Sequence, residues 1–242
     1  MLIHPFGSCT LPTMPVQDDV REQQMLQYFN LYVPEGRKRA ETDAYLKIDD
    51  VTIPFELKSA SGNSVSTVRD FGAEHIKKWA DKHWLFGFYN KEGTRLLYCY
   101  YASPIDMAPW ISKKASYVRP DIILASEVPN FIDANTLIRI LGEKSVYSYD
   151  DAFSIMKKQW SRERYDRERD ISDGYSLDHM VEILQQRCAY VISRGATLNN
   201  PHIPKSYFSG WDKITEDHAA ALREKVKAYL AATSTAATDL AT

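Results

Sequence analysis

The 242-residue chain has few cysteines and no hydrophobic run long enough to cross a membrane. Its three cysteines, Cys9, Cys99 and Cys188, are widely separated and odd in number. They match no metal-ligand spacing and suggest no disulfide framework, so a reducing compartment fits best. The first residues also lack the basic segment and apolar run of a signal peptide. We therefore expect a cytoplasmic protein without a membrane partner.

The sequence has no excess of charge of either sign. Thirty lysines and arginines stand against 32 aspartates and glutamates, which gives a formal net charge of −2. This balance excludes a polybasic protein that binds polyanions through bulk charge, but it allows a local basic cleft. The sequence also has no GxxxxGK[ST] loop, no GxSxG elbow and no HExxH motif. ATP-dependent chemistry, Ser-His-Asp hydrolysis and zinc proteolysis are therefore not indicated.

The first half of the chain alternates helical and strand patterns. Residues 1–17 carry three prolines and are expected to form an irregular arm. A helix should begin near Asp19 and Glu22, which resemble a capping pair, and end before Pro34 and Gly36. The further predictions are two strands within 40–58, a polar loop at 59–66, a helix at 67–82 and a hairpin of 84–89 and 96–101.

The second half of the chain is predicted to be mainly helical. We expect a strand at 121–125, helices at 131–141, 150–165, 177–194 and 216–230, and a disordered tail at 231–242. The fold class is thus α/β (α+β), with a central mixed sheet flanked by helices within residues 18–130. The helical part, residues 131–230, is expected to pack on that core and to serve recognition or dimerisation.

The most informative segment spans residues 42–58. A two-residue turn at Asp49-Asp50 pairs residues whose numbers sum to 99. This register collects apolar side chains on one sheet face, because faces alternate along a strand; they are Ala44, Leu46, Ile48, Val51, Ile53, Phe55 and Leu57. On the other face Asp43 lies opposite Glu56, with Lys58 two residues further on. A slip of one residue would destroy both features.

This trio has a chemical use. Two carboxylates about 5 Å apart at their Cβ atoms repel each other unless a cation lies between them or one is protonated. Mg²⁺ binds through one or two carboxylates together with substrate phosphate, and a lysine can stabilise charge at the phosphate or orient the attacking water. The alternative is an ordinary Glu-x-Lys ion pair on an exposed strand. Pro54 is unusual inside a strand and lacks a donor for a strand on the far side.

Asp43, followed by Pro54-Phe55-Glu56-Leu57-Lys58, resembles the Asp…Glu-x-Lys motif of the PD-(D/E)XK nuclease superfamily, to which most type II restriction endonucleases belong. The order of elements over about residues 18–101 is similar too, although Thr42 stands where the motif has proline. The resemblance implies that Asp43 and Glu56 bind the metal, Mg²⁺ with Mn²⁺ as a substitute. It also implies that Lys58 acts at the nucleophile.

Within that superfamily, a chain without an ATPase motif is most similar to a type II restriction endonuclease. Such enzymes usually cut short palindromic sites in double-stranded DNA as homodimers, alongside a cognate DNA methyltransferase of the same system. Two alternatives stay open: a DNA repair or recombination nuclease of the same fold, and a non-catalytic DNA-binding protein.

Several residues outside the hairpin are candidates for DNA contacts. Arg69 opens the helix expected after the motif, where it would hold a phosphate or belong to an ordinary amphipathic helix. A polar loop follows the helix at 177–194, and its residue types can read base edges. The loop candidates are Arg194, Asn199, Asn200 and His202; an ordinary turn is the alternative.

Two basic segments have a simpler explanation. Residues 37–39, Arg-Lys-Arg, would contact backbone phosphates or form a solvated basic turn. Residues 157–170 mix basic and acidic side chains at helical spacing, which predicts a salt-bridged surface helix.

Overall fold

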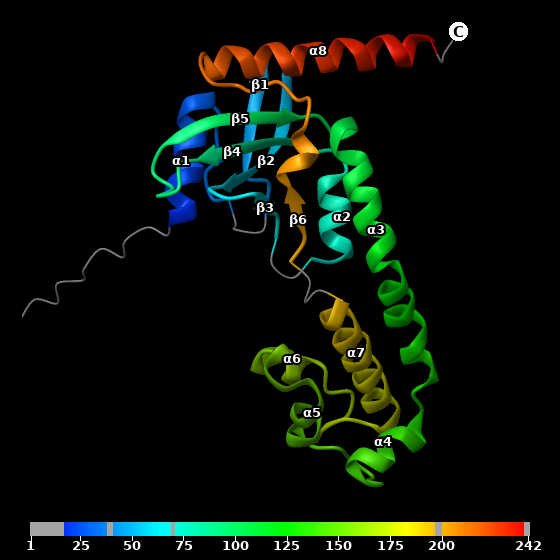
Figure 1. Ribbon diagram of the computed structural model, residues 1–242. Coiled ribbons are helices and arrows are strands. Elements are labelled where there is room, and N and C mark those ends of the chain that lie inside the picture. The colour runs from blue at the N-terminus through cyan, green and yellow to red at the C-terminus, as the bar shows by residue number, and fades with distance from the viewer. Residues whose placement is uncertain (1–16, 38–40, 69–70, 197–199, 240–242) are drawn as a thin grey trace, which may run out of the picture. The chain divides into compact units, whose positions relative to one another are not determined.

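The computed structural model describes residues 17–37, 41–68, 71–196 and 200–239. It is an α+β fold with a four-stranded mixed sheet and a mainly helical C-terminal half (Figure 1). The chain divides into two compact units. The sheet unit comprises Met1–Ser66, Asp81–Met107 and His202–Thr242, and the helical unit comprises Thr67–Ala80 and Ala108–Pro201.

The four-stranded sheet has the order β1-β2-β4-β5. Its strands are β1 (Ala44–Ile48), β2 (Val51–Ala60), β4 (His83–Tyr89) and β5 (Leu96–Ala102). β1 and β2 are antiparallel, β2 and β4 are parallel, and β4 and β5 are antiparallel. Both predicted hairpins are therefore confirmed.

The predicted register of the β1–β2 hairpin is confirmed. Ala44 pairs with Phe55 and Ile48 pairs with Val51, so paired numbers sum to 99. Asp49 takes a left-handed φ of 51°, which aspartate tolerates better than most residues. The predicted apolar face is buried except for Val51, which is 49% exposed at the hairpin tip. Pairing between β2 and β4 begins at Phe55, so Pro54 precedes that ladder and its missing donor costs no bond there.

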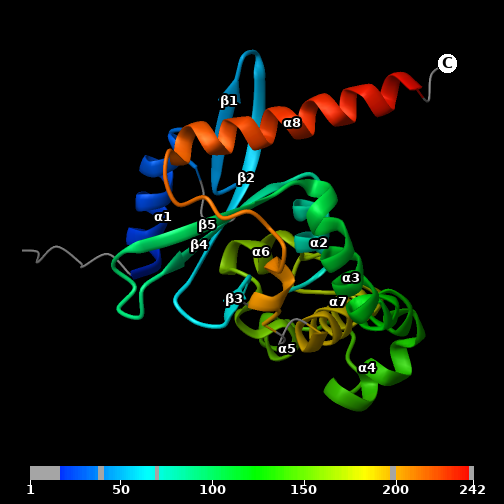
Figure 2. The ribbon, with the colours of Figure 1, turned by 45° about the horizontal axis from the view of Figure 1, so that its top comes forward.

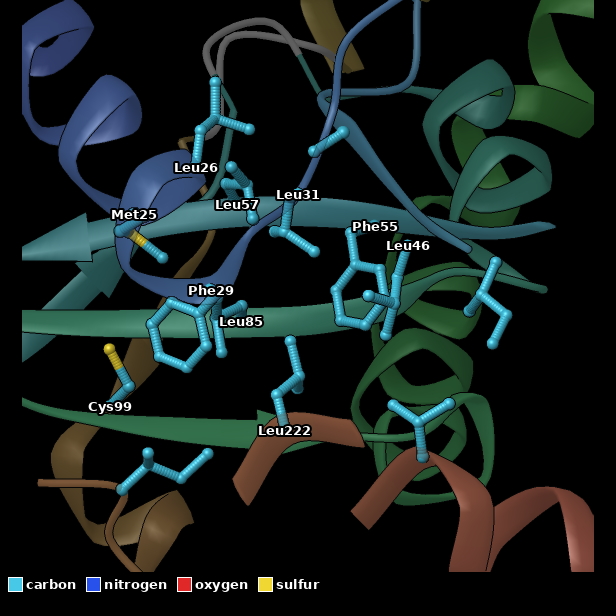
Figure 3. Packing of buried hydrophobic residues seen from close by; sticks show 14 of the residues in the cluster. Met25, Leu26, Phe29, Leu31, Leu46, Phe55, Leu57, Leu85, Cys99 and Leu222 are labelled. Atoms are coloured by element: carbon cyan, nitrogen blue, oxygen red, sulfur yellow. The ribbon is translucent and has the colours of Figure 1, made fainter. Parts of the chain in front are cut away.

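Two helices cover the apolar face of the sheet, α1 (Gln17–Phe29) and α8 (His218–Asp239). Met25 and Phe29 of α1 and Leu222 and Val226 of α8 join the strand residues in one buried cluster (Figure 3). Figure 2 shows α8 running across the sheet. Each fully buried side chain of this type contributes roughly 1.5–3 kcal/mol, so this face anchors the hairpin.

The opposite face carries aromatic side chains from β4 and β5. Phe86 and Tyr100 pack on Phe208, which belongs to the 3-10 helix η3 (Lys205–Phe208). Just before it, β6 (His202–Pro204) pairs with β3 (Ser64–Ser66). The loop predicted at 59–66 was therefore wrong in part, because β2 continues to Ala60 and β3 finds a partner far along the chain.

The helical unit is built around α7 (Leu177–Ala196). The helix predicted at 177–194 is therefore confirmed. The 3-10 helix η1 (Val128–Phe131), α4 (Ala134–Leu141) and α5 (Tyr149–Met156) pack on it. Its core is rich in aromatics, including the buried residues Tyr147, Tyr165 and Tyr175. The unit also contains α2 (Ala73–Trp79), shorter than the helix predicted at 67–82.

The helix predicted at 150–165 is divided. After α5, Lys157 has a positive φ of 54° and opens the 3-10 helix η2 (Lys157–Gln159), and α6 (Arg162–Arg167) follows. Opposite charges pair along this segment: Arg162 with Asp166 at 3.1 Å and Arg164 with Glu168 at 3.5 Å. The salt bridges predicted for residues 157–170 are thus confirmed, but the single surface helix is not, because only α6 within this range is α-helical.

Two sequence predictions about the second half of the chain are wrong. Residues 121–125 are not a strand but part of α3 (Pro104–Glu127), which contains Pro109 and Pro120. Residues 231–239 continue α8 rather than forming a disordered tail. In that stretch Thr233 and Thr235 donate their hydroxyl hydrogens to carbonyls one turn back, at 3.0 Å, so their polar groups are satisfied within the helix.

Two of the three cysteines lie within the described residues, and Cys9 lies outside them. Cys99 and Cys188 are free thiols. Within the four described ranges, no helix combines the length and the apolar character needed to cross a membrane.

Candidate active site

The β1–β2 hairpin brings Asp43, Glu56 and Lys58 together. Asp43 immediately precedes β1, and its Oδ2 accepts a hydrogen bond of 3.0 Å from the Leu57 amide. Glu56 and Lys58 alternate along β2 with Phe55 and Leu57, whose side chains are buried in the core cluster. The polar side chains therefore emerge on the face opposite the core, as the predicted register requires.

The lysine ammonium lies between the two carboxylates. Lys58 Nζ is 2.9 Å from Glu56 Oε1 and 3.7 Å from Asp43 Oδ2. The exposed fractions of the side chains are 16% for Lys58, 13% for Asp43 and 5% for Glu56. Both acids thus converge on a single, poorly solvated position that holds a cation.

Two further charged residues complete the cluster, and the sequence did not predict that either would join Asp43. Arg37 Nη2 donates to Asp43 Oδ1 at 2.9 Å, and Nη1 donates to Glu22 Oε1 at 3.2 Å. The Arg37 side chain is 19% exposed, so it is not the solvated turn residue considered above. Glu22 lies within α1, which begins at Gln17, so it is not part of a capping pair with Asp19. No sequence motif links Glu22 or Arg37 to Asp43; only the packing of α1 brings them near.

The cluster has an acidic excess. Glu22, Asp43 and Glu56 oppose Arg37 and Lys58, which leaves one net negative charge when all five are ionised. Burial and the nearby Asp43 raise the pKa of Glu22, against the lowering effect of Arg37 and Lys58. Burial alone would lower the pKa of Lys58, but Glu56 and Asp43 outweigh it and raise that pKa above its usual value. Lys58 is therefore a protonated ammonium at neutral pH.

The donor set fits a hard divalent cation held by two carboxylates. The ammonium of Lys58 lies within 4 Å of both acids, so oxygens of both carboxylates face one cation, and the same two acids would hold a metal ion. No group of three or more histidines, cysteines and acids suited to a metal occurs among the described residues. Mg²⁺ commonly uses one or two carboxylates and completes its shell with waters and substrate phosphate, so Asp43 and Glu56 suffice.

Three of the predicted DNA-contact residues lie among the described residues, in two different units. Arg194 is exposed in the last turn of α7, and Asn200 is exposed shortly after it, both in the helical unit. His202 belongs to the sheet unit, where it is exposed and pairs with Ser66. Arg69 and Asn199 lie outside the described residues.

No family model matches the chain, and no curated protein matches it. The residues and geometry of the hairpin are therefore the basis for assigning a function.

Proposed function

We propose that this protein is a metal-dependent endodeoxyribonuclease of the PD-(D/E)XK type. The observation that carries the proposal is the convergence of Asp43 and Glu56 on the Lys58 ammonium, at 3.7 and 2.9 Å. The order α1, β1, β2, α2, β4 also supports it, because the resemblance includes a helix, strands bearing the motif, a second helix and a further strand.

Each side chain of the trio has a distinct task in this proposal. Asp43 and Glu56 hold Mg²⁺, and the bound metal supplies Lewis-acid polarisation of the phosphate. Glu56 is the more buried of the two acids, and the Leu57 amide orients Asp43. Because the pKa of Lys58 is raised, its three N–H donors stay available to orient the attacking water and to stabilise negative charge developing on the phosphoryl oxygens.

We further propose that the biological activity is that of a type II restriction endonuclease. Its substrate would be double-stranded DNA in the cytoplasm, cut at a short site by a homodimer and protected by a cognate methyltransferase. The sequence contains no GxxxxGK[ST] loop, which favours cleavage that does not require ATP. Discrete plasmid fragments support this interpretation, whereas nicks, end-dependent digestion or structure-dependent cutting point to repair or recombination.

Plasmid digestion with purified protein and Mg²⁺ tests the chemistry. We expect discrete fragments with the unmodified protein and none after chelation of the metal. Asp43→Asn and Glu56→Gln preserve side-chain size but remove a ligand charge, so both should abolish cleavage. Lys58→Met should slow cleavage by roughly 10²–10⁴-fold.

Asp50→Asn is the matched control, because Asp50 is an exposed acid at the tip of the same hairpin. Its cleavage rate should equal that of the unmodified protein. Absence of cleavage across diverse DNAs with Mg²⁺ or Mn²⁺ would overturn the proposal, as would full activity in Asp43→Asn.

A further inference from the structure

Arg37 bridges two acids at the edge of the candidate site. Its guanidinium reaches Asp43 Oδ1 at 2.9 Å and Glu22 Oε1 at 3.2 Å through different nitrogens. Its Nε is buried and has no hydrogen-bond partner in the described part of the chain. The arginine is thus held by two carboxylates while one of its directed donors is unused.

The contact with Asp43 conflicts with metal binding. Asp43 Oδ2 accepts from the Leu57 amide and Oδ1 accepts from Arg37, so a divalent ion must compete for this carboxylate. A metal ion on Asp43 would also repel the adjacent guanidinium, because like charges a few ångströms apart interact strongly where water is largely excluded. Arg37 must therefore loosen its contact with Asp43 as the metal binds.

A displaced Arg37 has two suitable acceptors. Glu22 can retain one side of the guanidinium, so the side chain stays beside the site. The other side is then free to donate in a fork to an anion, and a guanidinium matches the geometry of a phosphate diester better than an ammonium does. The metal site would bring such a phosphate next to Asp43.

We propose that Arg37 is a substrate-phosphate-binding residue that exchanges Asp43 for the DNA phosphate when the divalent metal binds. This inference rests on the proposed nuclease function. Without metal, Arg37 and Lys58 offset two of the three acidic charges. With metal, Arg37 would turn from Asp43 to the substrate phosphate while Glu22 still holds it.

Metal binding and DNA cleavage should respond in opposite directions to loss of Arg37. In Arg37→Met, Mn²⁺ measured by isothermal titration calorimetry should bind roughly threefold tighter or more, because a competing cation is removed. DNA affinity from single-turnover cleavage with Mg²⁺ should fall by roughly 10- to 100-fold. Arg37→Lys keeps the charge but loses the fork, so its DNA affinity should be intermediate.

Two more variants separate this role from a merely structural one. Glu22→Gln removes the second anchor, so Arg37 should hold Asp43 more firmly and Mn²⁺ should bind more weakly, opposite to Arg37→Met. Lys225→Met also removes a cation from the sheet unit, from a pair with Asp212 at 3.2 Å. It should change neither metal nor DNA affinity.

The outcomes distinguish failure of the inference from failure of the proposed function. If the unmodified protein binds no Mn²⁺ and cuts no DNA, the nuclease proposal itself fails. Suppose instead that the unmodified protein binds Mn²⁺ and cuts DNA. If Arg37→Met or Arg37→Lys then has the same affinity for Mn²⁺ and the same affinity for DNA as the unmodified protein, Arg37 is not a phosphate-binding residue. Weaker Mn²⁺ binding in a folded Arg37→Met protein would show a structural role and also overturn the inference.

Discussion

Glu56 and Lys58 form a buried ion pair. Glu56 is 4% exposed, and its Oε1 is 2.9 Å from the lysine ammonium. A buried ion pair adds little net stability, because both partners lose water, but removing one partner leaves the other charge poorly compensated. The pair therefore constrains which substitutions the hairpin tolerates.

Replacing Lys58 should cost stability as well as activity. Lys58→Met leaves the Glu56 carboxylate buried without the ammonium, so we expect the free energy of unfolding at neutral pH to fall by about 3–5 kcal/mol. The double variant Glu56→Gln/Lys58→Met should recover most of that loss, because neither charge is left behind. Urea unfolding of the unmodified protein, Glu56→Gln, Lys58→Met and the double variant measures this, and an additive effect of the two substitutions would contradict it.

His83 makes the stability of the sheet unit sensitive to acid. It is 4% exposed and packs on the rings of Phe55, Tyr101 and Tyr229. Burial lowers its pKa from 6.5 to about 4, against the opposing effect of nearby aspartates. The unfolded chain thus takes up a proton near pH 6.5, while the folded protein does so only near pH 4.

The contribution of His83 to stability is complete above pH 6.5 and is lost as the pH falls toward 4. Its share of the free energy of unfolding should decrease by about 1.4 kcal/mol per pH unit across that window. Urea unfolding between pH 4 and 7.5 checks this against His83→Gln, which cannot titrate and should show a flatter profile. Identical profiles would show that His83 is not buried in its neutral form.

The contact between α1 and β4 depends on a residue without a side chain. A Cβ added at Gly87 would lie 2.9 Å from the Met25 sulfur and 3.2 Å from Leu96 Cδ1. We expect Gly87→Ala to lower the free energy of unfolding by about 1–3 kcal/mol, because Met25 must move within a packed core. Gly62→Ala is the control, since an added Cβ there meets nothing within 4 Å.

Met25→Ala should partly rescue Gly87→Ala. The shortened side chain leaves room for the new methyl group, so the double variant should be more stable than the sum of the single effects predicts. Simple additivity in thermal or urea unfolding would place the strain elsewhere.

The sequence predicts an element correctly where its pattern of residues is compatible with only one arrangement. In the β1–β2 hairpin, alternation along each strand and the position of the turn agree on one register, so the pattern of residues is enough to bring Asp43, Glu56 and Lys58 together. The two long apolar runs that form β4 and β5 likewise predicted two strands, and the short polar segment between them predicted that the strands pair as a hairpin. Burial of a common face is a strong constraint because a slip of one residue exposes it.

α3 shows where such reasoning fails. Pro120 and the run Ile122-Ile123-Leu124 favour a break and a strand, but the segment is helical and those three side chains are 39%, 40% and 48% exposed. Local preference therefore gave the wrong element. The placement of Glu22 and Arg37 beside Asp43 was missed for a related reason. Arg37 contacts Asp43, and Glu22 contacts Arg37, because of how α1 packs, which leaves no periodic signal.

Among the described residues, each of the two units contains its own buried hydrophobic cluster. The sheet unit is built around the cluster that includes Phe29, Phe55 and Leu222, and the helical unit around the cluster that includes Tyr147 and Met180. Residues of different chain segments meet in each core. Each unit should therefore respond separately to a substitution in its own core.

Gly174→Ala tests this separation. An added Cβ would meet the backbone carbonyl oxygen of Tyr147, and Tyr147 pairs with Tyr175 through hydrogen bonds of 2.9 and 3.0 Å. We expect a loss of about 2–4 kcal/mol confined to the helical unit. Hydrogen exchange followed by mass spectrometry should show faster exchange in α5 and α7 and unchanged exchange in β2 and β4. Uniform acceleration along the chain would indicate a single cooperative unit.

The division of the sheet unit among three chain segments also sets an order of events during synthesis. Leu46 and Phe55 are translated early, but Leu222 and Val226, which cover the same sheet face, come much later. At roughly 5–20 residues per second, the nascent sheet waits on the order of ten seconds for α8. Until α8 is made, the apolar face of the sheet can bind chaperones, and the hydrophobic core beneath the acidic cluster is incomplete. A ribosome that stalls before α8 would therefore release a chain without a stable hairpin, and under the proposed nuclease function such an incomplete copy should not cleave DNA.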